Sequence, residues 1–123
     1  MVGRMAYDQA EIDAMLPLQT AAFHILLALS GGQAHGYGIM HDVEARTDGA
    51  LRLSPGTLYR TIQRLLEDGL IEEPRKLSSA KDDPRRRYYR ITPFGTAVAR
   101  AETQRLTDLV RLAKGALRVA ASS

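Results

Sequence analysis

Two guanidinium groups and an amide occur at helical spacing near the middle of this chain. At about 100° per residue, Arg60, Gln63 and Arg64 fall on one side of a helix. The guanidinium fork matches O6 and N7 of guanine and a glutamine amide matches adenine, so these side chains suit base edges in the major groove. Ser54 and Thr57 add hydroxyl groups at the start of the same segment. The spacing favours a helix that reads double-stranded DNA, although a solvated helix face is the simpler alternative.

The residues around these side chains carry the signals of a two-faced helix. Ser54 is a good N-cap, Pro55 suits the first helical position, and Gly69 is a typical helix stop. The side chains expected to face the core are Leu58, Ile62, Leu65 and Leu66. Tyr59 lies at the border of that apolar face, so we expect it to be partly core and partly DNA contact.

The residues after this helix predict a β-hairpin with a basic tip. Leu70 to about Lys76 favours one strand and Tyr88 to Thr92 a second, with Tyr89 and Ile91 on the same face. The basic side chains expected at the tip are Lys81, Arg85, Arg86 and Arg87. Arginines there suit phosphates or a narrow minor groove, where the potential is most negative. A DNA-reading helix that leads into such a hairpin is the winged form of a helix-turn-helix.

Three helices are expected before the DNA-reading helix. A short acidic helix covers about Ala6 to Met15, a helix that is apolar on most sides covers Leu18 to Leu29, and a third covers His35 to about Arg46. At the start of the third helix, His35 and Tyr37 are expected to meet phosphate together with the N–H groups of its first turn.

The last predicted helix is longer than a small winged domain needs. From about Pro93 to Ala120 it would span about 40 Å at 1.5 Å per residue. A narrow apolar stripe along it is formed by Leu106, Leu109, Val110, Ala113 and Leu117. Packing against its own domain is one explanation of this stripe, and a dimer interface is the favoured one. A two-fold dimer would present two DNA-reading helices roughly 34 Å apart to a near-palindromic operator.

The predicted architecture is a mainly α protein with a small β-hairpin: a winged helix-turn-helix plus a long C-terminal dimerisation helix. We expect an N-terminal extension or helix over residues 1–16, the DNA-binding domain over 17–92 and the dimerisation helix over 93–123. At 123 residues the chain is long enough for one such domain with its own core.

Five segments of the chain form an ordered set of motifs. They are His35-Gly-Tyr-Gly-Ile39, Ser54-Pro-Gly-Thr-Leu-Tyr59, Arg64-Leu65, Asp68-Gly-Leu-Ile71 and Arg87-Tyr-Tyr-Arg-Ile-Thr-Pro-Phe-Gly95. In this order they resemble the signature of PadR-type transcriptional regulators, over roughly Leu16 to Ala120. Many members carry proline where this chain has Arg60, and this chain adds about fifteen residues before the family's usual first helix.

The resemblance implies a homodimeric regulator, most often a repressor, whose last helix packs with the first helix and N-terminal segment. It also implies a small-molecule effector that binds near the dimer interface and lowers DNA affinity. Side chains that could line such a pocket are Met5, Met15, Phe23 and Phe94, although a packed core explains each of them equally well.

The charge distribution agrees with a DNA-binding surface. Residues 1–51 hold two basic and six acidic residues, residues 52–90 hold ten and six, and residues 91–123 hold five and two. The positive excess therefore begins where the predicted DNA-reading helix begins, as expected for a phosphate-binding surface. An ordinary charged, solvated face is the alternative explanation.

Other chemistry has little support in the sequence. The chain has no cysteine, and its three histidines lack the spacing of a metal site, so no metal, cofactor or catalytic residue is predicted. No signal peptide or membrane span is predicted, which favours a soluble cytoplasmic protein. The alternative to a DNA-binding regulator is a winged-helix protein-interaction module that does not read DNA.

Overall fold

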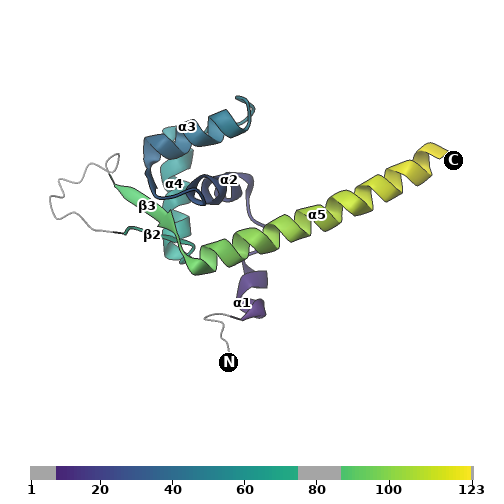
Figure 1. The fold of residues 1–123 in the computed structure, drawn as a ribbon, viewed down its shortest axis with the longest axis horizontal. Helices are drawn as coiled ribbons and strands as arrows, with labels where there is room; N and C mark the ends of the chain where they lie inside the picture. The colour runs from purple at the N-terminus through teal and green to yellow at the C-terminus, as the bar shows by residue number, and fades with distance from the viewer. Residues whose placement is uncertain (1–7, 75–86, 123) are drawn as a thin grey trace.

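The computed structural model describes residues 8–74 and 87–122 and contains a compact group of helices and short strands with one long projecting helix (Figure 1). The elements are α1 (Gln9–Ala14), α2 (Thr20–Leu29), β1 (Ala34–His35), α3 (Gly36–Arg46), α4 (Pro55–Glu67), β2 (Ile71–Glu72), β3 (Tyr88–Ile91) and α5 (Pro93–Ser122). This confirms the predicted winged helix-turn-helix with a long C-terminal helix. In the described part of the chain, no helix combines the length and apolarity that a membrane span requires.

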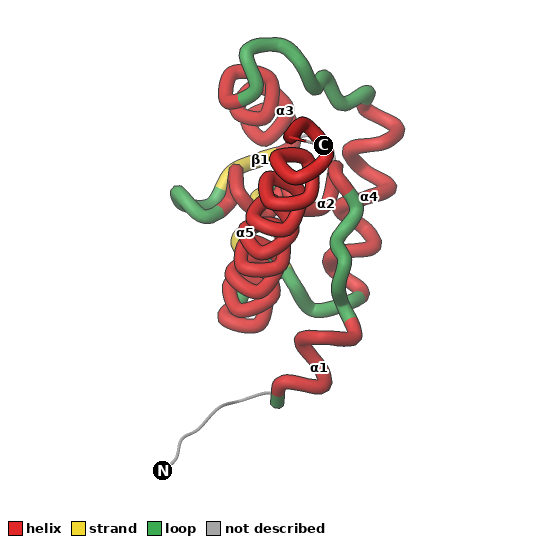
Figure 2. The backbone as a smooth tube through the Cα atoms, turned by 90° about the vertical axis from the view of Figure 1, so that its right-hand side faces the viewer, coloured by secondary structure: helices red, strands yellow, loops and turns green. Residues whose placement is uncertain are grey.

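Helix α2 is the centre of the core. Its side chains Ile25, Leu26 and Leu29 are buried, and α3, α4 and α5 all pack against it. Figure 2, viewed roughly along α5, shows α2 in the middle of the molecule, with α3 above it and α4 beside it. The near-uniform apolarity of this segment follows from that position, because a helix covered on several sides has no wide polar face.

Three short strands form the small sheet, in the order β1-β3-β2. Tyr88 and Tyr89 of β3 pair with β1, and Arg90 and Ile91 pair with β2, both antiparallel. The predicted alternation in β3 is confirmed, since Tyr89 is buried while Tyr88 and Arg90 are exposed. Sequence reasoning missed β1, because a strand of two residues has too few positions to show a period.

Several predicted boundaries differ from the structure by a few residues. Helix α2 begins at Thr20 rather than Leu18, whose backbone N–H bonds to the carboxylate of Glu102 in α5. The strand expected from Leu70 to Lys76 corresponds to β2, which covers only Ile71–Glu72. Within this segment, the described residues end at Pro74. His35 precedes α3 as its N-cap instead of being its first residue.

Helix α5 is fastened to the domain by its first half. Val98 and Glu102 are buried, and Arg105 holds the Glu102 carboxylate through two contacts, Nε to Oε1 and Nη2 to Oε2, each 2.8 Å. The Arg105 guanidinium and the Leu18 N–H hold the pKa of Glu102 below its ordinary value of 4.5, against the opposing effect of burial. Because Glu102 and Arg105 both belong to α5, their ion pair stabilises the helix itself, and the contact with the Leu18 N–H links Glu102 to the rest of the domain.

Candidate nucleic-acid interface

Helix α4 begins where the sequence predicts. The backbone N–H of Thr57 donates to Ser54 Oγ over 3.1 Å, and the Ser54 hydroxyl lies 3.1 Å from Thr57 Oγ1. Ser54 is therefore the N-cap, and Pro55 occupies the first turn. The core-facing side chains Leu58, Ile62 and Leu65 are buried, so the opposite side of α4 is turned to solvent.

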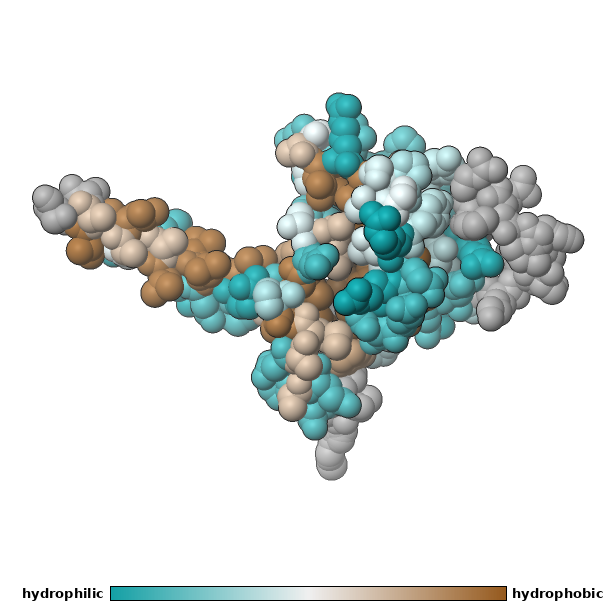
Figure 3. Space-filling model, turned by 180° about the vertical axis from the view of Figure 1, so that it is seen from behind, coloured by the Kyte–Doolittle hydropathy of each residue, from teal (hydrophilic) through white to brown (hydrophobic). Residues whose placement is uncertain are grey.

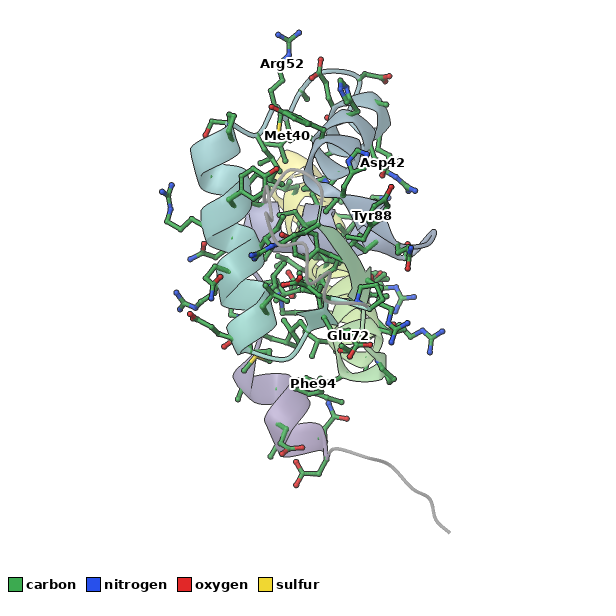
Figure 4. All side chains as sticks on the ribbon, turned by 90° about the vertical axis from the view of Figure 1, so that its left-hand side faces the viewer. Met40, Asp42, Arg52, Glu72, Tyr88 and Phe94 are labelled. Atoms are coloured by element: carbon green, nitrogen blue, oxygen red, sulfur yellow. The ribbon has the colours of Figure 1, made fainter. Side chains whose placement is uncertain are left out.

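That solvent face carries the three side chains expected to read bases. Arg60, Gln63 and Arg64 are all exposed, and Figure 4 shows nitrogen-tipped side chains projecting from the outer side of α4. Arg64 is 77% exposed, with Nε 3.9 Å from Asp68 Oδ2, and Gln63 Nε2 donates to Glu67 Oε2 over 3.2 Å. Surface contacts of this kind are worth about 0–1 kcal/mol, so both groups can exchange them for a ligand.

Arg60 differs from Arg64 in its surroundings. It makes no ion pair with any residue in the described ranges. A guanidinium without a local carboxylate keeps all of its donors for an outside acceptor. Arg60 is thus the most available cation on α4.

The start of α3 presents His35 in one defined tautomer. Its Nδ1 accepts the backbone N–H of Gly38 over 3.1 Å, so the neutral ring carries its hydrogen on Nε2 and can donate it to a phosphate oxygen. The His35 ring meets the Tyr88 ring edge-on, with centroids 5.4 Å apart. Tyr37 and Tyr88 are both exposed. Tyr88 was not among the predicted contacts, although its outward position in the strand was available from the alternation.

Tyr59 lies between α3 and α4. Its hydroxyl oxygen is buried, and a Cβ atom on Gly36 would overlap that oxygen and lie 2.8 Å from Tyr59 Cζ. The close approach explains why α3 begins with glycine, since any larger residue would push the two helices apart. The structure thus places the polar end of Tyr59 inside the fold rather than on the solvent face of α4.

Only one of the four basic residues predicted at the hairpin tip, Arg87, lies within the described residues. Lys81, Arg85 and Arg86 lie outside the described residues. Arg87 is exposed just before β3, with Nη1 3.9 Å from Glu73 Oε2. Across the strands, Arg90 Nε lies 2.7 Å from Oε2 of Glu72, which Figure 4 labels. The charges at the base of the hairpin thus pair with one another.

Beneath these pairs, Tyr89 anchors the hairpin in the core. Its side chain is buried, and burial together with the nearby Glu73 carboxylate raises the pKa of its hydroxyl above the ordinary value of 10.0. The phenol therefore stays neutral at physiological pH, and the base of the hairpin is held by an uncharged aromatic side chain.

The second half of α5 carries the residues expected at a dimer interface. Leu106 is half-buried and Ala113 is exposed, while Leu109, Val110 and Leu117 are 48%, 51% and 68% exposed. Figure 3 shows this projecting arm as largely apolar on the side in view. Two further exposed apolar side chains, Leu112 and Val119, widen the stripe beyond the predicted positions. Leu112 and Val119 could have been predicted from the sequence by considering every apolar residue of the helix instead of one narrow stripe.

The arrangement defines the class of the protein. Two helices, α3 and α4, are followed by a hairpin whose strands pack beside them, which is the winged helix-turn-helix. Residues 25–101 match the transcriptional regulator PadR-like family, and the chain belongs to this family. It is a transcriptional regulator of the PadR type.

Individual relatives agree with this assignment. Over 99 residues, which are 79% of this chain and 87% of the relative, the chain is 34% identical to the transcriptional regulator Rv3488 of Mycobacterium tuberculosis. The family and this relative are transcriptional regulators, not enzymes.

Solved structures agree in fold. A transcriptional regulator from Clostridium thermocellum superposes with a TM-score of 0.66 at 24% identity, covering 89% of this chain and 96% of that one. The adhesin competence repressor AdcR of Streptococcus pyogenes superposes with a TM-score of 0.52 at 16% identity, covering 89% and 72%.

Proposed function

We propose that this PadR-type regulator binds a specific DNA operator as a homodimer and represses transcription from it. The observation that carries the proposal is the solvent face of α4, where Arg60, Gln63 and Arg64 stand exposed on a helix whose opposite face is core. Arginine and glutamine at such positions match guanine and adenine in the major groove. A protein of this kind works beside the chromosome, in the cytoplasm.

Contacts with the phosphates would flank the bases. His35 Nε2 and Tyr37 belong to the start of α3, where N–H groups of the first turn also favour an anion. Ser54 and Thr57 would meet the backbone at the start of α4, and the basic hairpin tip with Arg87 would meet the neighbouring groove. Tyr59 would hold α3 and α4 in register rather than contact a base, because its hydroxyl is buried.

The dimer would form through the second half of α5. In the proposed dimer, residues 17–92 would bind DNA and residues 93–123 would join the two subunits. Residues 1–16 would add to the contact between the subunits. The support is the apolar surface of α5, which the first half of the helix does not share because it is packed on its own domain. Such exposed apolar side chains are typical of an interface between copies.

Binding of the purified protein to its own upstream DNA and to a scrambled duplex, across a salt series, tests the proposal. We expect retardation of the upstream duplex only, with an affinity that falls steeply as salt rises because phosphate contacts release counterions. Equal, weak retardation of both duplexes would instead favour a winged-helix module that binds a protein partner. If the upstream duplex alone is retarded, adding a small-molecule effector would lower the affinity for it and leave the scrambled duplex unaffected.

A further inference from the structure

A carboxylate lies within the solvent face of α4 that is proposed to read DNA. At about 100° per residue, Arg60, Gln63 and Arg64 cover an arc of about 100°, and Glu67 falls inside that arc, one turn after Gln63. The Glu67 side chain is exposed, as theirs are. A negative charge at this position repels DNA phosphates, so it weakens binding unless it contributes something else to recognition.

Glu67 contacts Gln63 across one turn of the helix. Gln63 Nε2 donates to Glu67 Oε2 over 3.2 Å. An ionised carboxylate accepts hydrogen bonds but cannot donate them, so Glu67 selects the orientation in which the amide nitrogen of Gln63 faces it. Gln63 Oε1 then lies on the other side of the amide, and the second hydrogen of Nε2 stays available. Gln63 therefore offers a base one acceptor and one donor in a defined arrangement.

We propose that Glu67 is a positioning residue for DNA reading, which orients the Gln63 amide so that Gln63 selects adenine and rejects guanine at one base pair of the operator. The proposal rests on the proposed DNA-binding function. In the major groove, adenine presents an N6 donor and an N7 acceptor, which match Oε1 and the remaining N–H of Gln63. Guanine presents two acceptors, O6 and N7, so Oε1 would face an acceptor unless the amide rotated by half a turn.

Rotation of the Gln63 amide has different consequences in the free protein and on DNA. In the free protein, water can solvate the Glu67 carboxylate, so the loss of this surface contact matters little. When α4 enters the major groove, water is displaced, and a carboxylate left without a donor carries a desolvation penalty. A rotated amide would also place Gln63 Oε1 against Glu67 Oε2, acceptor against acceptor. Glu67 therefore discriminates between bases mainly in the complex.

Retardation of operator duplexes that differ at a single base pair measures the ranking of bases. The base pair that Gln63 reads is the one at which Gln63→Ala loses the wild-type preference. At that pair we expect wild type to prefer adenine to guanine by at least about tenfold, within the usual cost of a mismatch. Glu67→Gln should reduce this ratio to about threefold or less, because an amide can donate as well as accept and so permits both orientations of Gln63.

Further variants separate the orientation of Gln63 from the charge of Glu67. Asp68→Asn removes a carboxylate from the next residue, whose Oδ2 lies 3.9 Å from Arg64 Nε, so it should strengthen binding to every duplex and keep the ranking at the Gln63 base pair. Glu67→Asp keeps the charge on a shorter side chain, so it should relax the ranking without this general gain. In the Gln63→Ala background, Glu67→Gln should no longer affect the ranking.

The side-chain amide signals of Gln63 report the contact in the absence of DNA. In isotope-labelled protein, a bond to a carboxylate moves one of the Nε2 hydrogens away from the position of a solvated amide. We expect Glu67→Gln to return that signal toward the solvated position and Asp68→Asn to leave it in place.

Several outcomes overturn the proposal. A wild-type ranking in Glu67→Gln would mean that Glu67 does not orient Gln63, and if only the urea midpoint fell, the pair would merely stabilise α4. An effect of Glu67→Gln that persists in Gln63→Ala would mean that Glu67 contacts a base itself. If wild-type protein retards no duplex selectively, the proposed function fails instead. The amide signals of Gln63 then decide separately whether Glu67 holds it.

Discussion

Arg60 and Arg64 occupy neighbouring turns of α4 and face solvent with weak local contacts or none. Their identity matters more than their charge, because the planar guanidinium binds a guanine edge or a carboxylate through two parallel bonds, which a lysine cannot do. The same two residues therefore carry the proposed reading of DNA.

Arg64→Ala should weaken operator binding by about 1–3 kcal/mol and relax the preference at one base pair. The matched control is Arg111→Ala, which removes the same charge from the far part of α5, where Arg111 lies 3.8 Å from Asp108. Retardation with a set of single-base operator variants measures both effects. Equal losses in the two variants would mean that Arg64 acts only through overall charge.

Gly36→Ala should lower the free energy of unfolding by about 1–3 kcal/mol, because its Cβ would overlap the Tyr59 hydroxyl. The matched control is Gly56→Ala, near the start of α4, where an added Cβ meets nothing within 4 Å. That change should stabilise the protein by about 0.4–1 kcal/mol. Urea midpoints of the two variants should therefore move in opposite directions, and a shift in the same direction would contradict the close packing.

At the scale of elements, the segments with local signals were the ones that sequence could predict. The cap at Ser54, the proline after it and the apolar period of α4 all lie within one segment, so its bounds were predictable. Strand β1 exists only because β3, more than fifty residues later in the chain, pairs with it. Likewise, α2 begins late where Leu18 bonds to Glu102 of α5, a long-range contact with no local sequence signature.

The candidate interface likewise contains features that local sequence signals predict and features that depend on contacts between distant elements. The exposed face of α4 was predictable because exposure follows from helical periodicity. The burial of the Tyr59 hydroxyl and the selection of one His35 tautomer were not, since each depends on how α3 sits against another element.

Glu102→Gln should weaken the pairing with Arg105 within α5 and the contact with the Leu18 N–H, and cost about 1–3 kcal/mol of stability near neutral pH. Because the folded-state pKa of Glu102 lies below 4.5, its charged form stabilises the protein fully above that value. The contribution is lost as the pH falls through the lowered pKa. Urea midpoints between about pH 6 and about pH 3 should therefore fall less steeply in Glu102→Gln than in wild type.

The control for this pH series is Asp108→Asn, which removes an exposed carboxylate from the same helix. Its midpoints should keep the slope of wild type. If Glu102→Gln also kept that slope, the buried ion pair with Arg105 would contribute nothing to acid unfolding.

At the scale of the whole molecule, the two halves of α5 have different surroundings. Its thirty residues span about 45 Å, and only the first half packs against α1, α2 and β3. The apolar side chains of the second half remain exposed in a single subunit. Dimerisation would cover them and set the distance between two copies of α4.

Leu109→Asp should give a folded monomer with weakened operator binding, because Leu109 is 48% exposed and supports no core. The matched control is Thr107→Asp, which adds the same charge on the opposite face of α5. Sedimentation should show a dimer for Thr107→Asp and wild type and a monomer for Leu109→Asp. A dimer in all three would move the interface away from this stripe.

The position of His35 has a mechanical consequence. The backbone of His35 pairs with Tyr88 of β3, and its ring both accepts the Gly38 N–H at the start of α3 and contacts the Tyr88 ring. A single residue therefore links the first turn of α3 to the base of the hairpin. Under the proposed function, these two elements would reach the duplex already positioned relative to one another. Docking would then cost less conformational entropy in this part of the domain, which would leave more of the binding free energy for discrimination among sequences.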